Sequence, residues 1–290
     1  MLNYEEFRKE MIKELKNSYP EYSFREKKVE KLNEEYYGVE IQSKGENVSM
    51  IVNLEGYYEM YQSQKTSVGK LRWELWNTYR KGSRDLESVN EISMFINDFE
   101  KIKRRIYLKV VSRDYINKSA LQDTPHQEFL NLIAHYYIDF GGGKEATITH
   151  KILSYWGKSM AEIQKIAENN MKSQFSTFCE PIEKLLGIEP TELKMWVVTY
   201  AEKYNRCYGA RIIYFKDLLD KLLEKNKING DCYLIPSSIH ELLIIFPQGN
   251  EKQLNQMIEE VNETCLEKRE ILSNKAYFFD RKKNEIRIIQ

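Results

Sequence analysis

The residues Tyr36–Leu54 read YYGVEIQSKGENVSMIVNL and carry the clearest strand pattern of the chain. Apolar and polar residues alternate on both sides of Gly45–Asn47, as in strands that bury one face. The alternating apolar positions are Val39, Ile41, Val48, Met50 and Val52. The turn residues between the two runs connect neighbouring strands, so we expect an antiparallel pair, Tyr36–Ser43 and Val48–Leu54.

On either side of this pair the pattern is mostly helical. Asn3 is a suitable N-cap for a helix that ends near Asn17, ahead of Pro20. A third strand is predicted over about Phe24–Leu32. Residues 55–80 are predicted to be helical, and a further helix is predicted from Leu86 to about Lys103. The apolar positions of the 55–80 segment include Tyr57, Tyr58, Met60, Tyr61, Leu71, Leu75 and Trp76.

The middle of the chain mixes both patterns. We expect a strand near Ile106–Val111 and a buried strand over Phe129–Phe140, although positions 129, 133, 136 and 140 also fit a helix. Gly141–Gly143 favours the strand, because it can close a hairpin with the following residues 146–149. Ser159 and Glu162 then form a capping box for a helix to about Met171.

The segment 175–191, which holds Pro181 and Pro190, is the predicted boundary between an N-terminal unit, 1–174, and a C-terminal unit, 192–290. The second unit alternates adjacent strand pairs with helices. Its predicted elements are strands at Met195–Tyr200, Ala210–Phe215, Cys232–Ile235, Leu242–Phe246, Ala276–Asp280 and Glu285–Ile289, and helices at Lys216–Lys227 and Asn250–Cys265. The fold class is therefore α+β, with antiparallel or mixed sheets and helices packed on one face, in two α+β units.

The bulk composition excludes several classes of protein. The 290 residues carry 44 Lys+Arg and 44 Asp+Glu, so the net charge is zero and nucleic acid is an unlikely partner. No run approaches the roughly 20 apolar residues that a membrane span needs, and the N-terminus has no secretory pattern. The four cysteines lack CxxC spacing and are expected to be reduced thiols, in a cytoplasmic protein. No cofactor fingerprint is present, and no cofactor is predicted.

Two strings combine side chains that could carry chemistry. The string Asp123–Phe129 includes His126 and Glu128, and the string Ile235–Leu242 includes His240 and Glu241. If the two turns converge, these four residues could bind a divalent metal through nitrogen and oxygen ligands. The competing interpretation is structural, because histidines beside strands often fix a turn, and neither string is an established metal or nucleophile motif.

Two further groups are candidate binding residues. Ser237 and Ser238 follow Pro236 and could contact a ligand, or could satisfy backbone groups of a turn. The densest basic cluster holds Lys101, Lys103, Arg104 and Arg105, with Lys109 and Arg113 downstream. This cluster could bind phosphate groups. Acidic residues flank it, however, and a solvated surface is the favoured interpretation.

Five strings in order along the chain resemble a bacterial family catalogued only as a domain of unknown function. They lie at residues 4–7, 124–130, 149–156, 233–241 and 277–280. The most specific string is Pro236–Glu241, PSSIHE, preceded by Ile235 where the family pattern has leucine. The resemblance extends over nearly the full length and implies a cytoplasmic bacterial or mobile-element protein, but no catalytic residue. The layout also distantly resembles a second uncharacterised family, built from two α+β units.

Three functions remain open on these observations. The leading hypothesis is a non-enzymatic protein that binds a protein partner or a small ligand, because balanced charge and absent motifs point away from catalysis. The alternative is a metal-assisted hydrolase or nuclease that uses His126, Glu128, His240 and Glu241. The third is nucleic-acid binding through the Lys101–Arg113 cluster. No membrane partner is expected.

Overall fold

The computed structural model describes residues 1–44, 49–64, 66–84, 98–141, 144–174, 177–189, 194–200, 208–247 and 251–290. The chain forms two compact units, Met1–Lys101 and Ile102–Gln290. Several sequence predictions lie outside the described residues: the Gly45–Asn47 turn, most of the helix from Leu86, and the roles of Cys207 and Asn250.

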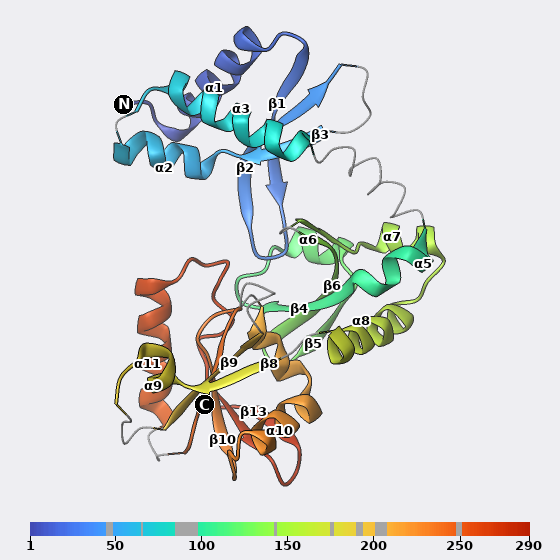
Figure 1. The fold of residues 1–290 in the computed structure, drawn as a ribbon, viewed down its shortest axis with the longest axis vertical. Helices are drawn as coiled ribbons and strands as arrows, with labels where there is room; N and C mark the ends of the chain where they lie inside the picture. The colour runs from blue at the N-terminus through green and yellow to red at the C-terminus, as the bar shows by residue number, and fades with distance from the viewer. Residues whose placement is uncertain are drawn as a thin grey trace. The chain divides into compact units, whose positions relative to one another are not determined.

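The N-terminal unit is a three-stranded antiparallel sheet with helices on one face (Figure 1). Its strands, in sheet order, are β1 (Tyr22–Glu30), β2 (Glu35–Ser43) and β3 (Ser49–Asn53), and its helices are α1 (Tyr4–Ser18), α2 (Glu55–Gln64) and α3 (Val68–Arg84). The register pairs Phe24 with Ile41 and Ile41 with Met50. The predicted antiparallel pair is therefore confirmed, and its alternating apolar side chains share the helix-covered face.

Local signals fix the first helix. The Asn3 side chain accepts a hydrogen bond from the Glu6 amide at 3.0 Å, and the Glu6 carboxylate accepts one from the Asn3 amide at 2.9 Å. This capping box satisfies two amide groups that have no partner inside the helix. The predicted N-cap is confirmed.

Aromatic side chains dominate the core of the N-terminal unit. The ring of Trp76, on α3, stacks on that of Tyr19 with centroids 3.7 Å apart, and also contacts Tyr79 at 5.1 Å. Arg8 of α1 is buried, and its guanidinium lies 3.8 Å from the centre of the Tyr37 ring and 3.3 Å from the Glu26 carboxylate. Its charge is thus balanced by a carboxylate and an aromatic face.

The C-terminal unit contains a four-stranded antiparallel sheet (Figure 1). In this sheet β6 (Leu132–Gly141) is central and pairs with β4 (Ile106–Ser112), β5 (His126–Phe129) and β7 (Lys144–Thr147). The neighbouring helices are α5 (Phe99–Ile102), η1 (Lys103–Arg105), α6 (Lys118–Asp123), α7 (His150–Trp156) and α8 (Met160–Gln174). Helix α8 packs against β4, where Asn170 donates hydrogen bonds to the carbonyls of Lys103 and Ile106.

The predicted strand over Phe129–Phe140 is a strand rather than a helix, but it begins later than expected. Leu130 has a φ of 57° and turns the chain, so β5 ends at Phe129 and β6 begins at Leu132. The hairpin after β6 is also confirmed, because β7 pairs with it. The sequence interpretation placed His126 in a turn, whereas the structure places it in β5.

A six-stranded antiparallel sheet completes the C-terminal unit. Its order is β13 (Glu285–Ile288), β12 (Tyr277–Asp280), β10 (Cys232–Pro236), β11 (Leu242–Ile245), β9 (Met195–Tyr200) and β8 (Thr177–Pro181). The accompanying helices are α9 (Ile182–Leu186), η3 (Gly209–Tyr214), α10 (Lys216–Lys225) and α11 (Glu251–Cys265). Helix α11 buries Ile258 against Tyr233, Ile245 and Ile289 on one face of this sheet.

Two predictions differ from this architecture. The segment 175–191 does not join two units, because β8 pairs with β9 along its whole length, and the division lies at Lys101–Ile102 instead. The predicted strand Ala210–Phe215 is wrong, since Gly209–Tyr214 forms a 3-10 helix. Five successive residues, 209–213, are buried there. Such a run of buried residues is typical of a central strand, but here the buried segment is a 3-10 helix with neighbouring elements packed around it.

Candidate functional site

A row of basic side chains crosses the four-stranded sheet. The strand register pairs His126 of β5 with His135 of β6, and His135 with Lys109 of β4. Directly opposed residues in antiparallel strands project from the same face, so the three side chains lie on one face of the sheet. Of these three, the sequence pattern indicates His126 as a candidate metal ligand and Lys109 as a neighbour of the basic cluster, but it does not indicate His135.

Lys109 is the centre of this face. Only 11% of its side chain is exposed, and its ammonium group forms an ion pair with Glu145 of β7. The same group lies 4.9 Å from the centre of the Tyr137 ring and 4.2 Å from that of Tyr208. A buried ammonium is costly unless it is paired, and here a carboxylate and two aromatic faces compensate its lost hydration.

The approach of Gly209 to β9 brings Tyr208 and His240 to Lys109. The Gly209 amide donates to the His240 carbonyl at 2.8 Å, and Thr199 Oγ1 donates to the same carbonyl at 3.0 Å. A Cβ at position 209 would lie 2.4 Å from Thr199 Cα and 2.6 Å from the His240 carbonyl oxygen. Only glycine fits here, because real Cβ atoms do not approach backbone so closely.

Replacement of Gly209 by alanine is expected to destabilise the protein by about 1–3 kcal/mol, because the methyl group would force the backbone of β9 and the His240 turn apart. Urea denaturation followed by circular dichroism measures the change. Gly56 is the matched control, since a Cβ there meets nothing within 4 Å. Equal stability of Gly209→Ala and Gly56→Ala would contradict the close approach.

The hydrogen bonds of His240 define its tautomer. The Tyr208 amide donates to His240 Nδ1 at 3.1 Å, so this nitrogen is an acceptor and the neutral ring carries its proton on Nε2. Burial lowers the pKa of His240; Glu270 and Glu241 oppose that shift, and Lys109 adds to it. A neutral His240 therefore offers an N–H donor at Nε2, beside the half-buried ring of Tyr208.

His135 is more deeply buried. Its residue exposure is 4%, and its Nδ1 atom has no hydrogen-bond partner among the described residues. Burial first, and then the charge of Lys109, lower the pKa of the imidazole to about 3. The ring is therefore neutral at physiological pH. We call the six residues of this region the Lys109 cluster: Lys109, His135, Tyr137, Glu145, Tyr208 and His240.

A buried arginine adjoins the Lys109 cluster. Arg211 of η3 is 3% exposed and donates hydrogen bonds to the Leu108 carbonyl at 2.9 Å and to the Tyr137 hydroxyl at 3.0 Å. Its guanidinium also lies 4.6 Å from the centre of the Tyr200 ring. These contacts join the four-stranded sheet to η3 and β9, and they fix the position of Tyr137 beside Lys109.

Three of the four predicted metal ligands have other partners, and the fourth, Glu241, is half-buried just before β11. His126 Nδ1 donates to the Thr124 carbonyl at 2.7 Å, and Glu128 forms an exposed ion pair with Arg113 at 3.1 Å. His240 presents a protonated nitrogen to its surroundings, which cannot ligate a metal. In the part of the chain that the structure describes, no group of three His, Cys, Asp or Glu side chains could hold a metal ion.

The predicted serine site is a turn. The Ser238 hydroxyl accepts a hydrogen bond from the His240 amide at 3.0 Å, and the Ser238 amide donates to the Glu241 carbonyl at 3.4 Å. Ser238 is buried, while Ser237 uses its amide on the Ile235 carbonyl at 3.0 Å. The two serines thus shape the turn that presents His240, which is the structural interpretation.

The residues of the predicted basic cluster lie on two kinds of element: Lys101, Lys103, Arg104 and Arg105 on α5 and η1, and Lys109 on β4. Lys101 forms an ion pair with Asp98 at 3.2 Å, and Arg105 donates to the Phe140 carbonyl at 3.3 Å. Lys103 and Arg104 lie with Arg105 in the turn η1, and their carbonyls accept hydrogen bonds from Asn170 and Tyr107. Lys109 is buried in the strand that follows. Basic residues that are close in the sequence therefore lie in different elements, with Arg105 at the end of η1 and Lys109 within β4.

The sequence offered weak signals for the residues that the structure brings together. Lys109 interrupts the apolar run Ile106–Val111, and such an interruption in a fully buried strand is the pattern of a paired internal charge. The roles of His135 and Arg211 depend on long-range contacts, which no local pattern encodes. The same holds for Tyr208, whose ring reaches Lys109 only because Gly209 packs against β9.

Comparison with known proteins identifies a family. No curated protein and no solved structure matches the chain. Among the described residues no helix has the length and apolar character needed to cross a membrane. A family model, described as a family of unknown function (DUF5688), matches residues 4–281 and thus nearly the whole length. The resemblance expected from the sequence is confirmed, and the chain belongs to the DUF5688 family.

Proposed function

We propose that this protein is a non-enzymatic binding protein that holds a small anionic ligand, with a carboxylate or phosphate group, at the Lys109 cluster. The single observation that supports this proposal is the placement of the Lys109 ammonium, which is held between two tyrosine rings beside a carboxylate, with the His240 ring next to one of these tyrosines. A cation whose position is fixed before binding loses little entropy when an anion arrives.

The surroundings of Lys109 favour an anion over a cation or a metal. Lys109 Nζ and His240 Nε2 are both donors, and they are associated with the same ring, that of Tyr208. Charge-assisted donors of this kind bind carboxylates and phosphates well in a partly dehydrated site. Glu145, about one third exposed, holds the ammonium in place while remaining in contact with solvent.

A cytoplasmic location in a bacterium is part of the same proposal, and the cysteines fit the cytoplasm. Cys179, Cys232 and Cys265 are described as free thiols. Burial raises the pKa of Cys232 to about 12 and that of Cys179 to about 11, so neither is a reactive thiolate. Unpaired thiols in a chain of this length fit a reducing compartment.

Thermal unfolding with added anions tests the proposal. Inorganic phosphate, acetate and a nucleoside monophosphate are titrated against the full chain, and at least one is expected to raise the melting temperature. An anion at about 100 times its Kd should add about 2.7 kcal/mol to the stability. Lys109→Met, which keeps the apolar stem, is expected to abolish that gain.

Lys221→Met is the matched control, because Lys221 is an exposed lysine on α10 of the same unit. It should keep the full response to the anion. The proposal fails if no anion stabilises the wild-type chain, or if Lys109→Met responds as the wild type does. A response that requires an added divalent metal would favour the metal-assisted hydrolase instead.

A further inference from the structure

The outer face of α3, in the N-terminal unit, combines an exposed tryptophan with basic side chains. Its inner face buries Leu71, Leu75 and Trp76. Its outer face presents Lys70, Trp73, Asn77, Arg80 and Lys81, spaced three or four residues apart so that they form one continuous strip. This strip, which we call the Trp73 strip, plays no part in the Lys109 cluster.

Helix α3 concentrates positive charge although the chain as a whole is neutral. Its sequence VGKLRWELWNTYRKGSR holds five Lys and Arg but a single acidic residue, Glu74. Helix α1, of similar length, holds four basic and four acidic residues in YEEFRKEMIKELKNS. The net charge of zero therefore hides a basic helix. The charge of the whole chain does not exclude an anionic partner for this surface.

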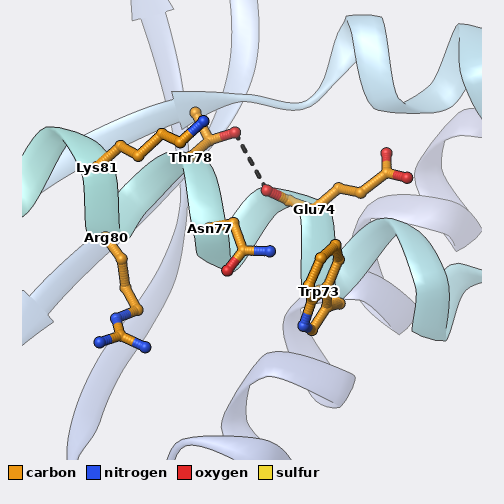
Figure 2. Close-up of a pocket in the computed structure, with 6 residues that line it drawn as sticks. All are labelled: Trp73, Glu74, Asn77, Thr78, Arg80 and Lys81. Carbon is orange, nitrogen blue, oxygen red and sulfur yellow. Dashed lines mark hydrogen bonds between the residues drawn. The ribbon is translucent and has the colours of Figure 1, made fainter.

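The Trp73 strip borders a hollow in the surface. The hollow has a volume of about 440 Å³ and is lined by Trp73, Glu74, Asn77, Thr78, Arg80 and Lys81. Figure 2 shows Trp73, Asn77 and Arg80 following one another along one side of α3, with Glu74, Thr78 and Lys81 along the adjacent side. Trp73 is 59% exposed, whereas Trp76, three residues later, is 8% exposed. A tryptophan so exposed offers one ring face for stacking.

Two kinds of anionic macromolecule, an acidic protein and a nucleic acid, could bind to such a strip. The amount of exposed apolar surface distinguishes between them. A protein interface needs several apolar anchors packed together. Of the large apolar side chains that the structure describes in the N-terminal unit, only Met1 and Trp73 are strongly exposed. Single-stranded nucleic acid needs less exposed apolar surface, because one aromatic ring can stack on a base while cationic side chains bind the phosphates.

We infer that the Trp73 strip binds single-stranded nucleic acid, with a base stacked on the Trp73 ring and backbone phosphates on Lys70, Arg80 and Lys81. Lys70 and Arg80 are ten residues apart, about 15 Å along the helix axis, which accommodates a few successive nucleotides. Asn77 lies between them and carries an amide that can donate to and accept from a base edge. Binding through stacking and phosphates depends little on base sequence.

Fluorescence anisotropy of the full chain with labelled oligodeoxythymidylate and oligouridylate tests this inference. Three phosphate contacts predict a slope of about −2 for log affinity against log salt, or about a 15-fold loss between roughly 50 and 200 mM salt. Trp73→Ala should weaken binding about tenfold or more, and Trp73→Phe should retain most of the affinity. Lys81→Ala should reduce the slope by about 0.7.

Matched controls come from the C-terminal unit. Tyr155→Ala removes an aromatic ring that is 64% exposed, and Lys221→Ala removes an exposed lysine; both should bind as the wild type does. Circular dichroism confirms that each variant is folded. The inference is overturned if neither oligonucleotide binds, if Trp73→Ala binds normally, or if duplex DNA binds equally well. Displacement of the oligonucleotide by polyglutamate at equal charge would show an acidic peptide site instead.

Discussion

Replacement of Trp76 by alanine is expected to lower the free energy of unfolding by about 3–5 kcal/mol. Trp76 is 8% exposed and its aromatic neighbours include Tyr19, Tyr22 and Tyr79, with centroids at 3.7, 4.9 and 5.1 Å. Truncation removes these contacts and leaves a cavity between α3 and the sheet. The loss combines the transfer free energy of the side chain with the cost of that cavity.

Trp73 is the matched control for this prediction, on the same helix and of the same residue type. Because it is 59% exposed, Trp73→Ala should change the free energy of unfolding by no more than about 0.5 kcal/mol. Urea denaturation followed by far-ultraviolet circular dichroism measures both variants. Similar losses for the two tryptophans would contradict the orientation of α3.

Acidification is expected to destabilise the protein through His135. Burial lowers the pKa of this imidazole from 6.5 to about 3, so the unfolded chain binds a proton at higher pH than the folded chain does. The contribution of His135 to stability is therefore complete above pH 6.5 and is lost progressively as the pH falls toward 3. At about pH 4.5 the loss amounts to about 3 kcal/mol.

His135→Leu removes the titrating group and fills the same buried position. Between about pH 7.5 and pH 4.5, this variant should lose about 3 kcal/mol less stability than the wild type. At neutral pH the substitution should cost little, because Nδ1 of His135 has no described hydrogen-bond partner. Urea denaturation at both pH values gives the comparison.

The control for the acid prediction is an exposed histidine, His150, which begins α7. His150→Gln is measured by the same denaturation at both pH values, and it leaves the buried site of His135 unchanged. The role of His135 is refuted if His135→Leu and the wild type lose the same stability on acidification.

Local sequence signals predicted the elements that short-range physics defines. The Asn3 N-cap and the Ser159 capping box are formed as expected, the latter with the Ser159 amide 2.9 Å from the Glu162 carboxylate. The alternation over Tyr36–Leu54 predicted the antiparallel pair, and the helical period of residues 55–80 placed Trp76 on an apolar face. In each case the interacting residues lie within one turn or one strand of each other.

Local sequence patterns gave wrong predictions for segments that are buried by residues distant in the sequence. The apolar run at 210–215 has the composition of a central strand, yet it forms a 3-10 helix because Gly209 packs against Thr199 and Arg211 reaches Leu108. Composition shows that a segment is buried but not which neighbours bury it. The composition of the proline-containing segment 175–191 is typical of a boundary, but composition does not show that β8, within this segment, pairs with β9.

The sequence by itself determined the α+β class, the antiparallel pairing, the helix caps and the membership of a DUF5688 family. Only the tertiary structure decided that Lys109, His135 and His126 share one face, that Tyr208 and His240 meet Lys109, and that Trp73 is exposed while Trp76 is buried. Register and packing join residues more than a hundred positions apart, as between Leu108 and Arg211 or between Tyr115 and Asn274. The free energy of such contacts depends on the whole fold, because residues that are distant in the sequence determine the position of each partner.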